Sequence, residues 1–199
     1  MALCSIFPPA GLILCAVTAA ELEPLYRYSS DAYHRIIEAG GFDHGARVEL
    51  IDGLLVEMSP KSREHELAVE RLADWLADRD RSRYRLRIAA PLSLADGTEP
   101  EPDVAVVAAG AADPYHPATA ELVIEVAVSS LHRDLIVKAS KYADAGVPLY
   151  LVVDLAGRRV IEHADPRDGA YRSVRDVEAL DARIPGVAPL PATELFATG

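Results

Sequence analysis

The sequence predicts a single α/β domain, and three features carry that prediction. Residues 121–128 and 147–154 are nearly continuous apolar runs rich in β-branched residues, which is typical of central strands buried on both faces. Residues 60–80 repeat apolar side chains at helical spacing. The 199 residues suit one domain, and with 50% hydrophobic and 26% charged residues the chain is neither disordered nor of low complexity.

Residues 1–25 are expected to form a loosely ordered leader ahead of one domain over 26–199. Met1 to Ala20 contains no charged residue, so a secretory signal is an alternative interpretation. No lysine or arginine precedes the apolar run, however, and Pro8 and Pro9 interrupt it. Because a bilayer span needs about 18 or more apolar residues, we expect a cytoplasmic protein with no membrane segment.

The first half of the domain is expected to alternate helix and hairpin. Ser29 or Ser30 caps a short helix that runs to Ala39. Residues 47–51 and 54–58 flank an Asp-Gly turn, which predicts a β-hairpin. Ser59 and Pro60 are a typical N-cap and first-turn pair for a helix that ends near Asp80.

The second half is expected to contain the sheet. Its predicted strands cover 84–94 (broken at Pro91), 103–108, 121–128, 147–154 and 159–163, with a helix over 134–145. The tail is expected to be mostly turns with one edge strand. Apolar C-terminal residues, expected to be exposed, make a homodimer plausible: Leu190, Leu195 and Phe196.

Charge and metal-ligating residues limit the functions that fit. A net charge of −11 argues against a general basic coat for nucleic acid, although not against a small basic cleft. Five alternating arginines between Arg79 and Arg87 form either a phosphate-contacting edge or a charged edge strand. Two cysteines near the N-terminus and six scattered histidines make a thiolate or histidine metal site unexpected, so oxygen ligands are the better candidates.

Two carboxylates on neighbouring predicted strands are the leading candidates for a site. Glu125 lies inside an apolar strand, where a carboxylate is costly to bury unless it is paired or bound to a metal. Asp103 opens the strand before it, and two such acids can share Mg²⁺ or Mn²⁺. Glu49, in the first hairpin strand, is either a third acid of the site or a solvated residue.

The helix after Glu125 contributes a polar stripe. Asp134, Lys138 and Tyr142 are spaced four residues apart, with Lys141 beside them. The stripe is either solvent-facing or directed at the acids, where Lys138 would orient a water or stabilise phosphoryl charge.

Taken in order, these motifs resemble the Uma-type family of putative restriction endonucleases in the PD-(D/E)xK nuclease superfamily. The resemblance spans roughly 26–163 and rests on the following segments: Glu49 to Gly53, His65, Pro102-Asp103, Glu121 to Val126, Asp134, Lys138, Tyr142, Gly146 to Pro148, and Tyr150 to Asp154. Two positions depart from the superfamily pattern. Ala127 stands where a lysine is usual, and Ser129-Ser130 replaces a Ser-Pro-Ser turn.

The resemblance implies a restriction-endonuclease-like central mixed β-sheet flanked by helices. It implies that Asp103 and Glu125 bind Mg²⁺ or Mn²⁺, that Glu49 joins them, that Lys138 supplies the lysine, and that His65 has either a site role or a surface position. The expected function is a metal-dependent phosphodiester hydrolase acting on DNA as an endonuclease. Two alternatives stay open: a catalytically inactive binding or regulatory protein of this fold, and a phosphoesterase for small molecules.

Overall fold

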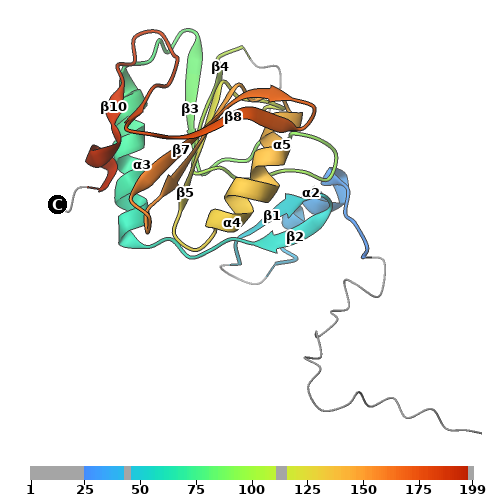
Figure 1. The fold of residues 1–199 in the computed structure, drawn as a ribbon. Helices are drawn as coiled ribbons and strands as arrows, with labels where there is room; N and C mark the ends of the chain where they lie inside the picture. Colours follow the sequence, from blue (N-terminus) through green and yellow to red (C-terminus); the bar gives the residue numbers. More distant parts are fainter. Residues whose placement is uncertain (1–24, 43–45, 111–115, 197–199) are drawn as a thin grey trace, which may run out of the picture.

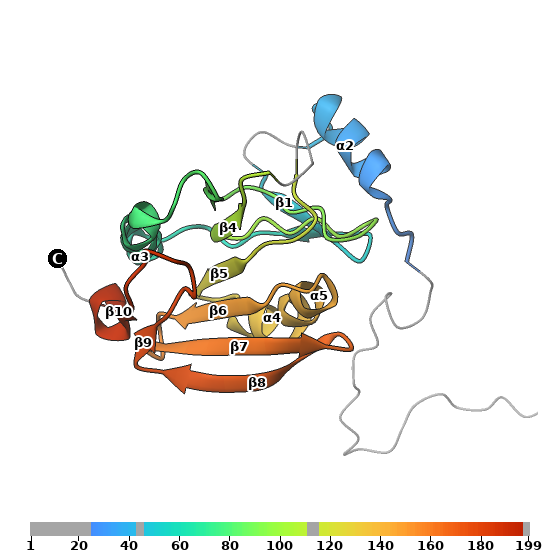
Figure 2. The same cartoon turned by 90° about the horizontal axis from the view of Figure 1, so that it is seen from above.

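A six-stranded mixed sheet forms the centre of the protein. The computed structural model describes residues 25–42, 46–110 and 116–196, so the expected leader lies almost wholly outside the described residues. The strand order is β3-β4-β5-β6-β7-β8. Only the β5–β6 pair is parallel, and every other neighbouring pair in the sheet is antiparallel. This arrangement confirms the expected α/β fold with a central mixed sheet (Figures 1 and 2).

The elements before the sheet match the predicted order. They are α2 (Ser30–Glu38), β1 (Val48–Ile51), β2 (Leu54–Glu57), α3 (Arg63–Trp75) and a 3₁₀ turn (Leu76–Asp78). The β1–β2 hairpin closes through Asp52 and Gly53, both at positive φ, as an Asp-Gly turn between twisted strands requires. The hairpin forms a separate two-stranded sheet.

The central sheet and its helix follow in sequence. Its strands are β3 (Tyr84–Ile88), β4 (Val104–Ala108), β5 (Leu122–Ala127), β6 (Leu149–Asp154), β7 (Arg159–Arg167) and β8 (Ala170–Val177). Between β5 and β6 one helical segment comprises α4 (Leu131–Arg133), a π-helical turn (Asp134–Lys138) and α5 (Ala139–Asp144). This segment is the crossover that a parallel strand pair needs.

The two faces of the sheet are covered by different elements. Alternate residues of β4, β5 and β6 pack on α3 and the C-terminal segment, whereas the others pack on α5. Figure 1 shows α3 and α5 on opposite sides of the sheet. Because both faces are covered, β5 and β6 are buried at every position. Glu125 on β5 shares the α5 side with Val123 and Ala127, since alternate residues of a strand point the same way.

Several predicted element bounds are wrong; the strand predicted over 159–163, for example, runs on to Arg167. The helix predicted to open at Ser59 begins instead at Arg63, where the side chain of Ser62 accepts a hydrogen bond from the amide of His65. The strand predicted over 84–94 ends at Ile88, because Ala89 takes a positive φ that breaks the extended backbone. The helix predicted over 134–145 begins at Leu131 and contains the π-helical turn.

The C-terminal tail is more ordered than the sequence suggests. β8 pairs along β7, β9 (Ala179–Leu180) pairs with β10 (Leu190–Pro191), and a 3₁₀ turn (Ala192–Phe196) follows. Leu195 and Phe196, which were expected to be exposed, are 2% and 8% exposed and pack in the core with α3. They therefore give no support to a homodimer.

Two further observations bear on the sequence predictions. β3 lies at the edge of the central sheet and carries two of the five alternating arginines, Arg85 and Arg87. Across the described parts of the chain, no helix has the length and apolarity required to cross a membrane.

Candidate active site

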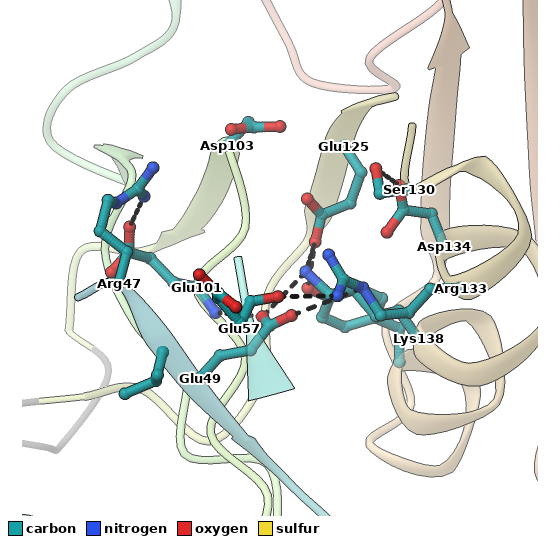
Figure 3. Close-up of polar contacts among 12 residues, drawn as sticks. Arg47, Glu49, Glu57, Glu101, Asp103, Glu125, Ser130, Arg133, Asp134 and Lys138 are labelled. Carbon is teal, nitrogen blue, oxygen red and sulfur yellow. Dashed lines mark hydrogen bonds and ion pairs between the residues drawn. The ribbon is translucent and has the colours of Figure 1, made fainter. Parts of the chain in front are cut away.

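Lys138 is the centre of a buried charge cluster. Its ammonium Nζ lies 2.9 Å from Oε2 of Glu49 and 3.0 Å from Oε1 of Glu125. All three side chains are at least 94% buried. Figure 3 shows the two carboxylates approaching Lys138 from separate strands. The interpretation of Glu49 as a solvated hairpin residue is therefore wrong.

Asp103 and Glu125 occupy neighbouring strands on the same side of the sheet. β4 and β5 pair with Val104 opposite Ile124, and continuing that antiparallel register by one residue places Asp103 opposite Glu125. Directly opposite residues have Cβ atoms about 4.5–5.5 Å apart and point to the same side. In agreement, Oδ2 of Asp103 accepts a hydrogen bond from the amide of Val126 at 2.9 Å. The structure thus brings the two predicted acids together.

His65 lies beside Asp103. Its Nε2 is 3.0 Å from Oδ1 of Asp103, and the residue is 7% exposed, so the surface alternative for His65 is wrong. His65 is presented by the first turn of α3, which Ser62 caps. Asp103 is consequently held through both oxygens, one by an amide and one by an imidazole.

The π-helical turn explains how Lys138 reaches the acids. A π turn adds one residue to a helical turn and is common at functional sites. It begins at Asp134, whose Oδ2 accepts from the hydroxyl of Ser130 at 2.6 Å, and ends at Lys138. One turn further on, the hydroxyl of Tyr142 donates to Oε1 of Glu125 at 2.9 Å. The polar stripe expected on this helix is therefore buried against the acids.

Lys141, which the sequence placed beside the stripe, does not join the site. Its ammonium lies 2.8 Å from Oδ1 of Asp52 in the hairpin turn, and both side chains are partly exposed. Lys141 thus ties α5 to the β1–β2 turn.

The two strand acids have opposite protonation tendencies. Burial raises the pKa of Glu125 to about 8, because the loss of hydration outweighs the attraction of Lys138, and the charges of Asp134, Asp103 and Glu49 add to the rise. Burial alone would also raise the pKa of Asp103. The hydrogen bond and charge of His65 and the amide of Val126 overcome that effect and leave its pKa below the usual value. Near neutral pH, Asp103 is therefore an ionised carboxylate, whereas Glu125 opposite it readily takes a proton.

A small cleft opens over these residues. It has a cavity volume of about 40 Å³, and since about 10–15 Å³ accommodates one water, it has room for about three water-sized ligands. Its polar lining includes His65, Asp103, Glu125, Ser130 and Lys138. Carboxylate oxygens are the ligands that Mg²⁺ and Mn²⁺ prefer. Oxygen Oε1 of Glu49, buried without a hydrogen bond from the described residues, adds to this negative environment.

Cationic side chains line the cleft near the acids. Arg47, Lys61 and Arg133 all border it. Arg47 pairs with Glu101 at 2.6 Å, and Arg133 donates to the carbonyl of Glu57 at 3.0 Å, so both are anchored (Figure 3). The cleft therefore combines an acidic floor with local positive charge, despite the negative charge of the whole chain.

Only weak sequence features indicated that Tyr142 and His65 belong to the candidate site. Tyr142 falls on the stripe with Lys138, but its contact with Glu125 depends on the π turn. His65 sits at the third helical position after the Ser62 cap, a spacing that becomes visible only once the true cap is known.

The fold and site together define a protein of the restriction-endonuclease-like class. The chain belongs to the Uma2 family, whose model matches residues 30–195 and carries the description "Putative restriction endonuclease". A solved structure with the same fold is that of a protein from Anabaena variabilis ATCC 29413, titled a putative nuclease belonging to DUF820. It is 12% identical and has a TM-score of 0.65, with 84% of this chain and 97% of that chain covered. No curated protein matches this sequence.

Proposed function

We propose that the protein is a metal-dependent phosphodiester hydrolase that cleaves DNA as an endonuclease. The observation that carries the proposal is the pairing of Asp103 with Glu125 across β4 and β5, with the Lys138 ammonium 3.0 Å from Glu125. Family membership and the nuclease-like fold support the same reaction class.

Asp103 and Glu125 would hold the divalent cation, Mg²⁺ or Mn²⁺. When bound, such a cation supplies Lewis-acid polarisation of the phosphodiester and lowers the pKa of a coordinated water. Glu125 gives up its proton to the medium when it becomes a ligand, since a ligating carboxylate must be ionised. His65 fixes the rotamer of Asp103 through the 3.0 Å contact.

Lys138 orients the attacking water and stabilises charge on the phosphoryl oxygens. Glu49 is a positioning residue: it holds the ammonium at 2.9 Å from the hairpin side while Glu125 holds it from the sheet. Tyr142 fixes Glu125 from α5. Fixed donors aimed at developing charge need no reorganisation during the reaction, which is why such a buried amine is effective.

Arg47, Lys61 and Arg133 would contact the phosphates that flank the scissile bond. A few cationic side chains at one cleft give local, salt-sensitive binding of a polyanion without a basic overall charge. We therefore propose a modest intrinsic affinity for DNA, concentrated at the cleft.

The test is cleavage of supercoiled plasmid with Mg²⁺ or Mn²⁺. We expect nicking or linearisation that a chelator stops and that Glu125→Ala lowers by about 10²-fold or more. Glu70→Ala, an exposed acid on α3, is the matched control and keeps full activity. Chelator-resistant cleavage, or equal activity in Glu125→Ala and Glu70→Ala, would refute the proposal.

One observation favours the alternative of a non-catalytic binding or regulatory protein. Both oxygens of Asp103 already accept hydrogen bonds from the protein, and an oxygen so engaged is a weaker metal ligand. Calorimetry with Mn²⁺ separates the two functions. Binding that Asp103→Asn abolishes supports the hydrolase, and the absence of binding in the unmodified protein supports the alternative.

A further inference from the structure

A second cluster of metal-ligating side chains lies away from Lys138. It consists of His34 on α2, Glu99 in the loop before β4, and His116 in the segment before β5. One ligand atom from each of the three lies within 4.8 Å of the others, and no other group of three such residues does so in the described parts of the chain. The sequence analysis treated the histidines as scattered, whereas the fold brings His34 and His116 together around Glu99.

The ligand atoms are close to the spacing that one cation requires. Nε2 of His34 lies 2.7 Å from Oε2 of Glu99, and the rings of His34 and His116 meet edge to face at 5.9 Å. Zn²⁺ binds imidazole nitrogen and carboxylate oxygen at about 2.0–2.2 Å in tetrahedral geometry, so bound atoms lie roughly 3.3 Å apart. Around one cation the His34–Glu99 pair would open by about 0.6 Å, and the other separations would close by no more than about 1.5 Å from the 4.8 Å limit.

Burial and unsatisfied polarity also point to a ligand. The side chain of Glu99 is 2% exposed, and its carboxylate faces the one imidazole of His34. Nδ1 of His116 is buried and has no hydrogen-bond partner among the described residues. A buried ring nitrogen without a partner is costly, and metal ligation by the imidazole is one way to satisfy it.

The three donor groups, two imidazoles and one carboxylate, indicate which kind of cation would fit. Two neutral imidazoles and one carboxylate favour a borderline transition-metal ion over Mg²⁺, which prefers oxygen ligands.

The backbone holds the three ligand-bearing segments in place. Glu99 pairs with Leu50 of β1 through hydrogen bonds of 2.7 and 3.4 Å. α2 is tied to the turn before Glu99, because the amide of Ser30 donates to Asp96 at 3.0 Å and the amide of Gly97 donates to the Ser30 hydroxyl at 3.1 Å. Pro117 accepts from the amide of Ser93 at 3.0 Å, which fixes the residue next to His116.

This cluster is separate from the proposed active site. Paired residues of adjacent strands point to the same side, so Glu99 shares the side of Leu50, opposite to that of Glu49. We propose that His34, Glu99 and His116 form a Zn²⁺ site that joins α2, the loop before β4 and the segment before β5. Three protein ligands leave one position for water or an exogenous ligand.

Zinc titration of the full chain tests this site, with excess Mg²⁺ present to occupy oxygen-ligand sites. We expect one Zn²⁺ per chain, with affinity falling at least about tenfold in His34→Ala and in His116→Ala. His132→Ala, an exposed histidine on α4, is the matched control and retains full affinity. Because binding to the native state alone raises the melting temperature, Zn²⁺ at about 100-fold above Kd should raise Tm by roughly 5–10 °C.

Two results would overturn the proposal: affinity unchanged within twofold in His116→Ala, or loss of Zn²⁺ binding in Glu125→Ala, which would place the ion at the other site. His34→Gln and His116→Asn repeat the test with smaller changes in shape, and their zinc-free melting temperatures report folding. None of these readouts uses DNA cleavage, so failure of the zinc site and failure of the hydrolase proposal are distinguishable.

Discussion

At the scale of single residues, the main feature of the candidate active site is that its charged side chains are buried. Lys138 is 3% exposed and lies between Glu49 and Glu125. Removing one partner of a buried ion pair costs about 3–5 kcal/mol, since the other charge is left uncompensated. Glu125 can relieve this imbalance by taking a proton, which its raised pKa of about 8 allows.

The protonation of Glu125 makes stability depend on pH. Its pKa rises from an ordinary value of 4.5 to about 8 in the folded protein, mainly through burial, so the folded state holds this proton more tightly. The resulting stabilisation is fully present below pH 4.5 and is lost as pH rises to about 8, by up to ~1.4 kcal/mol per pH unit. Urea unfolding at a series of pH values measures it.

Glu125→Gln is the control for that measurement, because an amide cannot titrate. The free energy of unfolding of the unmodified protein should fall relative to that of Glu125→Gln across this range. Parallel pH profiles of the two proteins would contradict the assignment of a raised pKa to Glu125.

At the scale of elements, two helical segments present residues of the candidate site, and each does so from an irregular part of the helix. α3 presents His65 from the turn that Ser62 caps, and the π turn presents Lys138. Sequence periodicity predicted both helices but neither irregularity. Ser59-Pro60 has the composition of a cap, yet the helix begins only at Arg63.

The position of the α3 cap is testable with two serine variants. Ser62→Ala removes the acceptor for the amide of His65 and should lower the free energy of unfolding by about 1 kcal/mol. Ser59→Ala, at the cap that the sequence predicted, should change it by less than about 0.5 kcal/mol. Chemical denaturation of both variants gives the comparison. A larger loss in Ser59→Ala would restore the sequence-based start of the helix.

At the scale of the whole molecule, the C-terminal segment closes the core on the α3 side of the sheet. Arg71 of α3 donates to the carbonyl of Leu195 at 3.0 Å, and Trp75 donates to the carbonyl of Ala188 at 2.7 Å. Leu195 and Phe196 pack against the same core cluster as β4, β5 and β6. The end of the described chain is thus part of the fold that holds α3 and its His65.

Truncation of the Leu195 side chain should therefore destabilise the whole domain. A buried Leu→Ala change costs about 2–5 kcal/mol through lost burial and the cavity left behind, and Leu195 is 2% exposed. Ile37→Ala on α2, 49% exposed in the folded state, is the control and should cost less than about 0.5 kcal/mol. Thermal unfolding measures both. Equal melting temperatures would show that the C-terminal segment does not contribute to the core.

The sequence by itself determined the class of fold and the order of its strands along the chain. It also predicted that Asp103 and Glu125 lie on neighbouring strands. Apolar runs and turn residues report the local backbone conformation. A carboxylate inside such a run, as at Glu125, is recognisably costly to bury even before its contacts are known. Only the tertiary structure decided which side chains meet: His65 with Asp103, Glu49 with Lys138, and His34 with Glu99 and His116. The reason is that these contacts join residues from about 17 to 90 positions apart, and their meeting depends on strand register, the π turn and chain closure, none of which leaves a periodic pattern in the sequence.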